Sequence, residues 1–79
     1  MRLDKYLKVS RLIKRRTVAA EACSAGKVSV NGKGQKPSYD VKVGDILELT
    51  FGEKIIKIQV VSLQEFVKKE DADSMYKAI

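Results

Sequence analysis

The chain has 79 residues and a mass of 8.8 kDa, which suits one small domain and excludes most enzyme scaffolds with a substrate cleft of their own. Hydrophobic residues make up 44% and charged residues 33%, so a folded domain with a thin core is expected. Sixteen Lys and Arg stand against ten Asp and Glu, and the net charge of +6 predicts an anionic partner.

The basic charge belongs to one part of the chain. Residues 1–36 contain ten cations and two anions, whereas residues 37–79 contain six cations and eight anions. The net charges are therefore +8 and −2, and such asymmetry favours a binding face over a general aid to solubility.

Several classes of site are excluded by residue type. Cys23 is the single cysteine and histidine is absent, so a disulfide, a zinc site of N and S ligands and a histidine-based catalytic group are excluded, and no cofactor is expected. Ala22 and Ala25 beside the thiol predict that it is buried and reduced, which favours the cytoplasm. The charged start and the lack of a long apolar run predict neither a signal peptide nor a membrane span.

Two helices are predicted in the first third of the chain. Apolar residues recur at helical spacing within residues 2–10 and predict a short amphipathic helix. Residues 11–16 are predicted to form a tight connection whose Leu12 and Ile13 enter the core. Thr17 is predicted to be the N-cap of a second, alanine-rich helix over residues 18–25, which ends at Gly26 in the left-handed conformation.

The apolar period changes from 3.6 to 2 at Lys27, which predicts strands. A strand with Val28 and Val30 runs into the turn 31–34, and a second turn covers residues 37–40. Further strands are predicted over residues 46–51 and 54–63, joined by the turn Gly52-Glu53. The fold class is therefore predicted to be α+β, with two short N-terminal helices in an L packed on a small, mostly antiparallel sheet.

The composition changes after Leu63, where a loosely held C-terminal helix or tail is predicted. Its candidate anchors are Phe66, Val67, Met75 and Tyr76. The domain organisation is accordingly predicted as one domain over residues 1–64 and an extension over residues 65–79.

The strongest candidate site is Lys14-Arg15-Arg16, immediately before the second helix. A helix N-terminus carries free N–H groups and a partial positive charge, so adjacent cations are favourable if a phosphate binds there; the alternative is a set of solvated connector charges. Cations of the first helix extend the site into a ridge, and those around the following strand either flank it or keep a sheet edge soluble. The predicted nucleic-acid-binding residues are Arg2, Lys5, Arg11, Lys14, Arg15, Arg16, Lys27, Lys33 and Lys36.

Aromatic residues are scarce in the predicted strands, where only Phe51 occurs. This argues against base stacking on the sheet and predicts recognition of backbone and shape. Tyr6 is expected in the core, whereas Tyr39 is expected either to pack or to stack on a base. No spacing brings two carboxylates together by local geometry, so no catalytic activity is predicted.

Four stretches, in this order, resemble the ribosomal protein S4 type of RNA-binding domain: residues 2–7, Arg16 with Ala19, residues 26–32, and Gly44-Asp45. The resemblance covers about residues 1–50 and implies two helices in an L that grip structured RNA, with the sheet behind them. This chain departs from the family at Arg15, where many members have Ser, so that Thr17 would have to cap the second helix.

Residues 1–17 and the small size resemble short bacterial proteins of ribosome-associated quality control, which are related to the heat-shock protein fifteen group. The resemblance implies a cytoplasmic protein that is monomeric off the ribosome, uses no membrane, and contacts the ribosomal RNA of large subunits still carrying peptidyl-tRNA. It further implies a partner that recruits alanyl-tRNA to extend the nascent chain with alanine. The RNA contacts are assigned by resemblance to Arg2 and Arg16, and then to Lys5, Arg11 and Arg15.

Three other functions are weighed against this one. A related factor would rescue blocked large subunits without adding alanine. A DNA-binding helix-turn-helix protein would also combine two short helices with a basic ridge, although the strand-rich second half and the Asn-Gly turn favour RNA. An RNA-modifying enzyme such as a pseudouridine synthase is disfavoured because the chain is too short to include the catalytic part.

Overall fold

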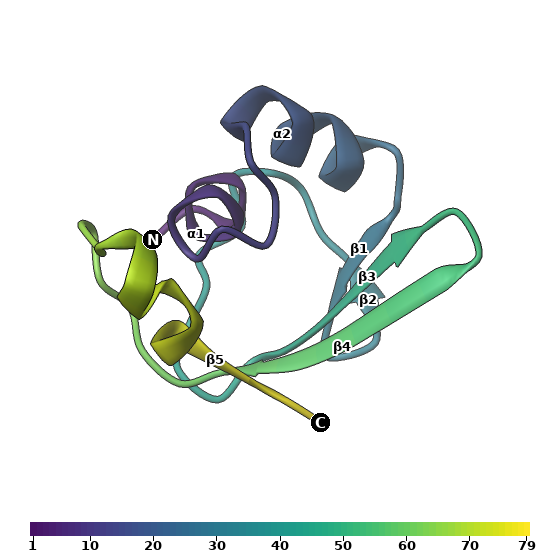
Figure 1. Ribbon diagram of the computed structural model, residues 1–79. Coiled ribbons are helices and arrows are strands. Elements are labelled where there is room, and N and C mark those ends of the chain that lie inside the picture. The colour runs from purple at the N-terminus through teal and green to yellow at the C-terminus, as the bar shows by residue number, and fades with distance from the viewer.

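A computed structural model describes residues 1–79 and shows the predicted α+β fold (Figure 1). Two α-helices come first, α1 over Leu3–Val9 and α2 over Arg16–Ser24. Five strands and a 3-10 helix follow in the order β1 Val28–Val30, β2 Lys33–Gly34, β3 Ile46–Phe51, β4 Lys54–Val60, η1 Lys69–Met75 and β5 Tyr76–Ala78.

The strands form a single sheet in the order β2-β1-β3-β4-β5, and every neighbouring pair is antiparallel. Both α-helices lie on the same side of this sheet (Figure 1). Asn31 and Gly32 have positive φ angles of 51° and 86°, which is the backbone that a two-residue hairpin between β1 and β2 requires. The turn predicted there is therefore confirmed.

The core lies between the helices and the sheet. Leu3, Tyr6 and Leu7 are fully buried, which confirms the apolar stripe predicted for the first helix. On β1 and β3 buried residues alternate with partly exposed ones, as expected for strands with one covered face. Cys23 of α2 is a free, buried thiol, as predicted.

The connection between the helices folds back on α1. The backbone N–H of Ile13 donates to the carbonyl of Leu7 at 3.1 Å, and the Ile13 side chain is buried. Leu12 is half-buried and packs against the same core. The reversal depends on Arg11, the second residue after α1, which adopts a left-handed φ of 61°.

The predicted N-cap of α2 was wrong. Arg15, with extended backbone angles, is the N-cap residue, and Thr17 lies exposed within the first turn without a capping hydrogen bond. The backbone N–H of Ala19 donates to the carbonyl of Arg15 at 3.0 Å, so the first turn is already closed before Thr17 could act as a cap. Gly26 does end the helix region with a positive φ of 76°.

The C-terminal segment includes the predicted helix, as η1, and a strand that was not predicted, β5. Met75 is fully buried, and half-buried Val67 and Tyr76 pack against the core, so three of the four predicted anchors are confirmed. Phe66 is 92% exposed, so the fourth was wrong. The hydroxyl of Tyr6 donates to the carbonyl of Met75 at 2.8 Å, and the segment is thus attached more firmly than expected. The predicted last strand ends at Val60 instead of Leu63 because the chain then turns toward η1.

Candidate nucleic-acid interface

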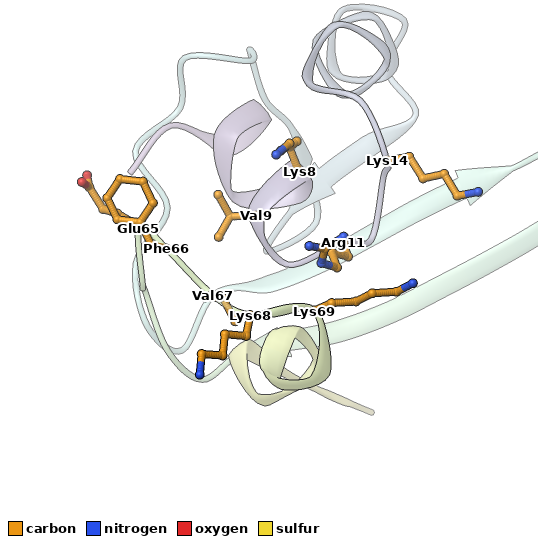
Figure 2. Close-up of a pocket in the computed structure, with 9 residues that line it drawn as sticks. All are labelled: Lys8, Val9, Arg11, Lys14, Glu65, Phe66, Val67, Lys68 and Lys69. Atoms are coloured by element: carbon orange, nitrogen blue, oxygen red, sulfur yellow. The ribbon is translucent and has the colours of Figure 1, made fainter.

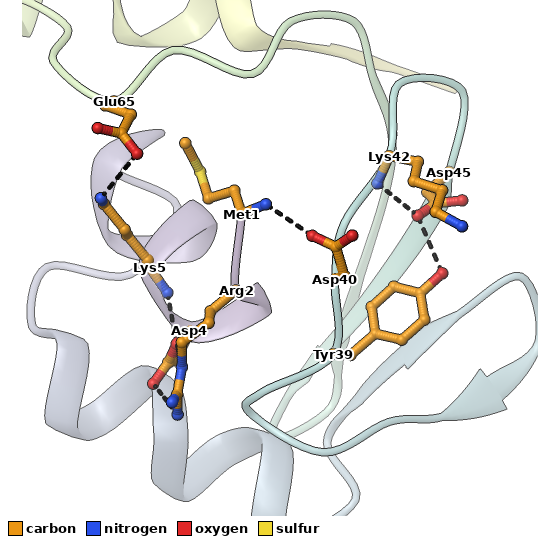
Figure 3. A network of polar contacts seen from close by, with 9 residues as sticks. All are labelled: Met1, Arg2, Asp4, Lys5, Tyr39, Asp40, Lys42, Asp45 and Glu65. Atoms are coloured by element: carbon orange, nitrogen blue, oxygen red, sulfur yellow. Dashed lines mark hydrogen bonds and ion pairs between the residues drawn. The ribbon is translucent and has the colours of Figure 1, made fainter.

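A buried carboxylate holds two guanidinium groups at the surface between α1 and α2. Asp4 accepts from Nε and Nη2 of Arg2 at 3.1 and 3.3 Å, and its Oδ2 lies 3.5 Å from Nε of Arg16 (Figure 3 shows the contact with Arg2). The side chain of Asp4 is only 5% exposed, whereas those of Arg2 and Arg16 are 53% and 48% exposed. These three residues are named the Asp4 cluster below.

Asp4 stays ionised in this setting. Burial alone would raise the pKa of Asp4, but the hydrogen bond from Arg2, the backbone N–H of Lys5 and the charge of Arg16 together hold it below its ordinary value. One negative charge thus faces two positive charges. The cluster has a net charge of +1, and its half-exposed guanidinium groups have further N–H donors for an outside acceptor such as a phosphate.

Two of the other predicted binding residues lie close to the Asp4 cluster, one because it is the neighbour of Arg16 in sequence and one because of a backbone hydrogen bond. The loop that follows Lys36 is fixed to α1, because the backbone N–H of Asp4 donates to the carbonyl of Pro37 at 3.1 Å. Lys36 itself is exposed, and Arg15 is exposed directly before Arg16. The structure therefore brings Arg2, Arg15, Arg16 and Lys36 to one region.

Lys5 is engaged by an acid from the C-terminal segment. Its Nζ lies 3.3 Å from Oε1 of Glu65, and the Lys5 side chain is 33% exposed (Figure 3). The pair joins α1 to the segment before η1. The RNA contact predicted for Lys5 stays a prediction.

Arg11 and Lys14 are exposed but do not belong to the Asp4 cluster. They line an open groove of about 870 Å³ between the connection 11–15 and the segment 65–69 (Figure 2). The opposite side of this groove comes from Lys68 and Lys69, which the sequence analysis had left out.

Lys27 and Lys33 lie elsewhere. Lys27 follows α2 at the end opposite Arg16, and a nine-residue helix separates the two by roughly 13 Å at about 1.5 Å per residue. Lys33 belongs to the edge strand β2. Neither is brought to the Asp4 cluster, and their part in binding stays a prediction.

Asp45 and Asn31 organise turns. Asp45 is buried and accepts from Asn31 Nδ2 at 3.1 Å, from the Tyr39 hydroxyl at 3.1 Å and from the Lys42 backbone N–H at 2.9 Å (Figure 3 shows the last two contacts). Burial and the neighbouring Asp45 carboxylate raise the pKa of Tyr39. These contacts fix the loop before β3 and give the Asp45 carboxylate a structural role.

No three His, Cys, Asp or Glu side chains gather in an arrangement able to hold a metal ion. No helix combines the length and the apolar character needed to cross a membrane.

Asp4 was missed as a site residue because an acid in a basic segment looks unfavourable for binding an anion. The available signal was its place two residues after Arg2, in the first turn of a helix whose apolar stripe was already known. Its contact with Arg16, twelve residues further on, depends on how the two helices cross. Local spacing contains no information on that crossing.

Comparisons with known proteins agree with this geometry. The sequence profile of the S4 domain family matches residues 1–47. The chain is 55% identical over 76 residues to the RQC P-site tRNA stabilizing factor of Bacillus subtilis, covering 96% of this chain and 88% of that protein. It is 56% identical over 79 residues to the protein of the same name from Listeria monocytogenes, covering 100% and 86%. The trimeric structure of Vibrio cholerae heat shock protein 15 superposes with a TM-score of 0.93 at 30% identity, covering 100% of this chain and 81% of that chain.

Proposed function

The chain belongs to the S4 domain family, and from this membership and the Asp4 cluster we propose that it binds the RNA of large ribosomal subunits still carrying peptidyl-tRNA. Its relatives' names support an RNA-binding role in ribosome-associated quality control. In that role the protein contacts ribosomal RNA and the tRNA in the P site together, as a binding factor and not as an enzyme.

The observation that carries the proposal is the pair of half-exposed guanidinium groups on one buried carboxylate. A guanidinium that is already fixed by a carboxylate loses less conformational entropy when it binds a phosphate. Its planar donors then match phosphate oxygens in a defined direction. Such preorganisation suits folded RNA, where phosphates occupy fixed positions.

The resemblance to proteins of ribosome-associated quality control supports a more specific role. The protein works in the cytoplasm on the ribosome, is a monomer when free, and supports a factor that recruits alanyl-tRNA for extension of the nascent chain with alanine. Rescue of blocked subunits without alanine addition is the second candidate, favoured by the fold shared with heat shock protein 15.

Sedimentation of tagged protein with large subunits tests the binding step. Arg2→Ala and Arg16→Ala are each expected to move the protein from the large-subunit fraction to the top of a sucrose gradient, with co-migrating tRNA lost in parallel. The double variant Lys54→Ala/Lys57→Ala on β4 removes two exposed cations from the sheet and is expected to sediment normally. Unchanged sedimentation of both arginine variants would overturn the proposal.

The two candidate roles predict nascent chains with different C-terminal ends. Mass spectrometry of peptides released from large subunits is expected to find C-terminal alanine tracts in cells with the wild-type protein and to find fewer when it is deleted. Equal alanine content with and without the protein would leave rescue as its role.

A further inference from the structure

The groove between the connection 11–15 and the segment 65–69 has the composition of a second anion site (Figure 2). Five cations line it, all exposed and none in an ion pair: Lys8, Arg11, Lys14, Lys68 and Lys69. Its one acid, Glu65, is engaged by Lys5 at 3.3 Å. Like charges gathered along one groove repel one another, and an anionic occupant relieves that repulsion.

The groove joins parts of the chain that are far apart in sequence. Lys8 comes from the last turn of α1 and Arg11 is the second residue after that helix, whereas Lys68 precedes η1 and Lys69 is its first residue. Half-buried Val9 and Val67 lie between these sides and pack against the core. The two basic sides are thus fixed to the same folded body.

An aromatic ring stands at the end of the groove. Phe66 is 92% exposed, although burying such a side chain is worth about 1.5–3 kcal/mol. Figure 2 shows its ring at one end, beside Glu65, with the side chains of Lys14 and Lys69 toward the other. A single exposed apolar residue is common on proteins, but here it adjoins five unpaired cations.

We propose that this groove binds a single-stranded stretch of RNA, with a base stacked on Phe66 and phosphates along the lysines and Arg11. Cations that follow a backbone and an aromatic face that accepts any base form the usual combination for unpaired nucleotides. The inference rests on the proposed RNA-binding function and adds to it a second contact with a different RNA conformation. The Asp4 cluster contacts folded RNA, and the groove contacts unpaired nucleotides.

Fluorescence tests the stacking directly, because the chain contains no tryptophan. Phe66→Trp is titrated with an oligouridylate of about twelve nucleotides, a length suited to one small binding site. Stacking is expected to quench the indole fluorescence. Phe51→Trp, at the end of β3, is the matched control and is expected to show no change. Equal signals from both variants, or none from Phe66→Trp, would overturn the proposal.

Affinity for the same oligouridylate tests the energetics. Phe66→Ala is expected to weaken binding by about fivefold to a hundredfold, the range found for loss of one stacked base. The double variant Lys68→Ala/Lys69→Ala is expected to lower the log–log salt slope by about 1.4, whereas Lys54→Ala/Lys57→Ala leaves it unchanged. Phe66→Trp and Phe66→Ala both change a solvent-exposed side chain, so the fold is expected to persist.

Two comparisons separate this proposal from others. Polyglutamate of matched charge is expected not to quench Phe66→Trp; quenching equal to that by oligouridylate would instead indicate an acidic protein segment as the occupant. Arg2→Ala and Arg16→Ala, each combined with Phe66→Trp, are expected to retain oligouridylate quenching while losing large-subunit sedimentation. Failure at the groove with sedimentation still sensitive to Arg16 would therefore reject this inference and leave the proposed function intact.

Discussion

Asp4 on α1 lies 3.5 Å from Nε of Arg16, the first residue of α2, and so connects the two helices through a buried carboxylate. The same carboxylate receives two hydrogen bonds from Arg2. Arg2 and Arg16 thus contact the same carboxylate, that of Asp4. Removal of the carboxylate should therefore affect both arginines together.

Asp4→Asn is expected to weaken large-subunit binding although it raises the net charge. Simple charge attraction predicts tighter binding for the variant, whereas loss of positioning predicts binding weaker by about three- to tenfold, or about 1 kcal/mol. Equilibrium binding to purified subunits measures the difference. Glu21→Gln on α2 makes the same change of charge at an exposed residue and is expected to bind as well as wild type or slightly better. Tighter binding by Asp4→Asn would show that Asp4 does not position the arginines.

The same variant changes stability in acid. Because the pKa of Asp4 is lowered in the folded protein, its contribution to the free energy of unfolding is present above the ordinary value near 3.8 and is lost as pH falls through the lowered value. Urea unfolding between pH 6 and pH 2 is expected to show a smaller loss of stability for Asp4→Asn than for wild type. Parallel curves would contradict the ionised, paired state of Asp4.

Salt dependence measures how many phosphates the protein contacts. If about five phosphates are neutralised, the logarithm of the association constant for structured RNA is expected to fall with the logarithm of salt at a slope of roughly −3.5 to −4.5. Arg2→Ala is expected to make this slope less steep by about 0.7–0.9. A flat response for wild type would contradict binding through the basic residues.

The helices and the first hairpin were predictable because they depend on neighbouring residues. Leu3, Tyr6 and Leu7 define one helical face, and Asn31-Gly32 supplies the positive φ angles of the turn. The start of α2 was not predictable in this way. Thr17 is a good capping residue by type, yet the helix begins earlier, where Arg16 meets Asp4 of the other helix.

The structure of the C-terminal segment depends even more on contacts between residues that are far apart in sequence. Tyr6 and Met75 are in direct contact across 69 residues of sequence, and β5 exists because β4 offers an open edge. The residues 76–79 alone contain no clear strand pattern. The groove beside Phe66 likewise forms only after η1 is placed near the end of α1. The division into residues 1–64 and 65–79 stays a prediction.

Met75→Ala tests how far the C-terminal segment supports the core. Met75 is fully buried, so truncation is expected to lower the free energy of unfolding by about 2–5 kcal/mol. Tyr6→Phe removes only the 2.8 Å hydrogen bond and is expected to cost about 1 kcal/mol. Denaturant unfolding measures both. A negligible effect of Met75→Ala would show that the Met75 side chain contributes little to the core.

Cys23 provides a test of burial in α2. Desolvation, together with the nearby charge of Asp4, raises the pKa of the Cys23 thiol to about 11. The native thiol is therefore expected to resist iodoacetamide at pH 8.5 and to react once urea unfolds the chain, as followed by mass spectrometry. Because the folded pKa is raised, the contribution of Cys23 to the free energy of unfolding is fully present below pH 9 and is lost as pH rises toward 11. Cys23→Ala is expected to remove part of the alkaline loss of stability, the rest coming from Tyr6 and Tyr39, whose pKa values burial also raises. Rapid alkylation of the folded protein would contradict the buried position.

Arg11 combines an unfavourable backbone with an exposed charge. Its φ of 61° belongs to the left-handed region, which costs a residue with a side chain about 1–2 kcal/mol and costs glycine little. Glycine would therefore suit the fold better at this position, yet the chain has an arginine, and its side chain lines the basic groove. This combination is expected where binding, and not stability, determines the residue.

Two substitutions at this position separate stability from binding. Arg11→Gly and Arg11→Ala remove the same guanidinium, so both are expected to weaken oligouridylate binding equally and to lower the salt slope by about 0.7. Only Arg11→Gly relieves the backbone, and it is expected to be more stable than Arg11→Ala by about 1 kcal/mol, after the greater freedom of glycine in the unfolded chain is subtracted. Thermal unfolding of the two variants, and fluorescence titration of each combined with Phe66→Trp, measure these effects independently. Equal stability of the two would show that the left-handed backbone costs no more than the extra freedom of glycine in the unfolded chain. Unchanged binding by both would remove Arg11 from the groove's contacts.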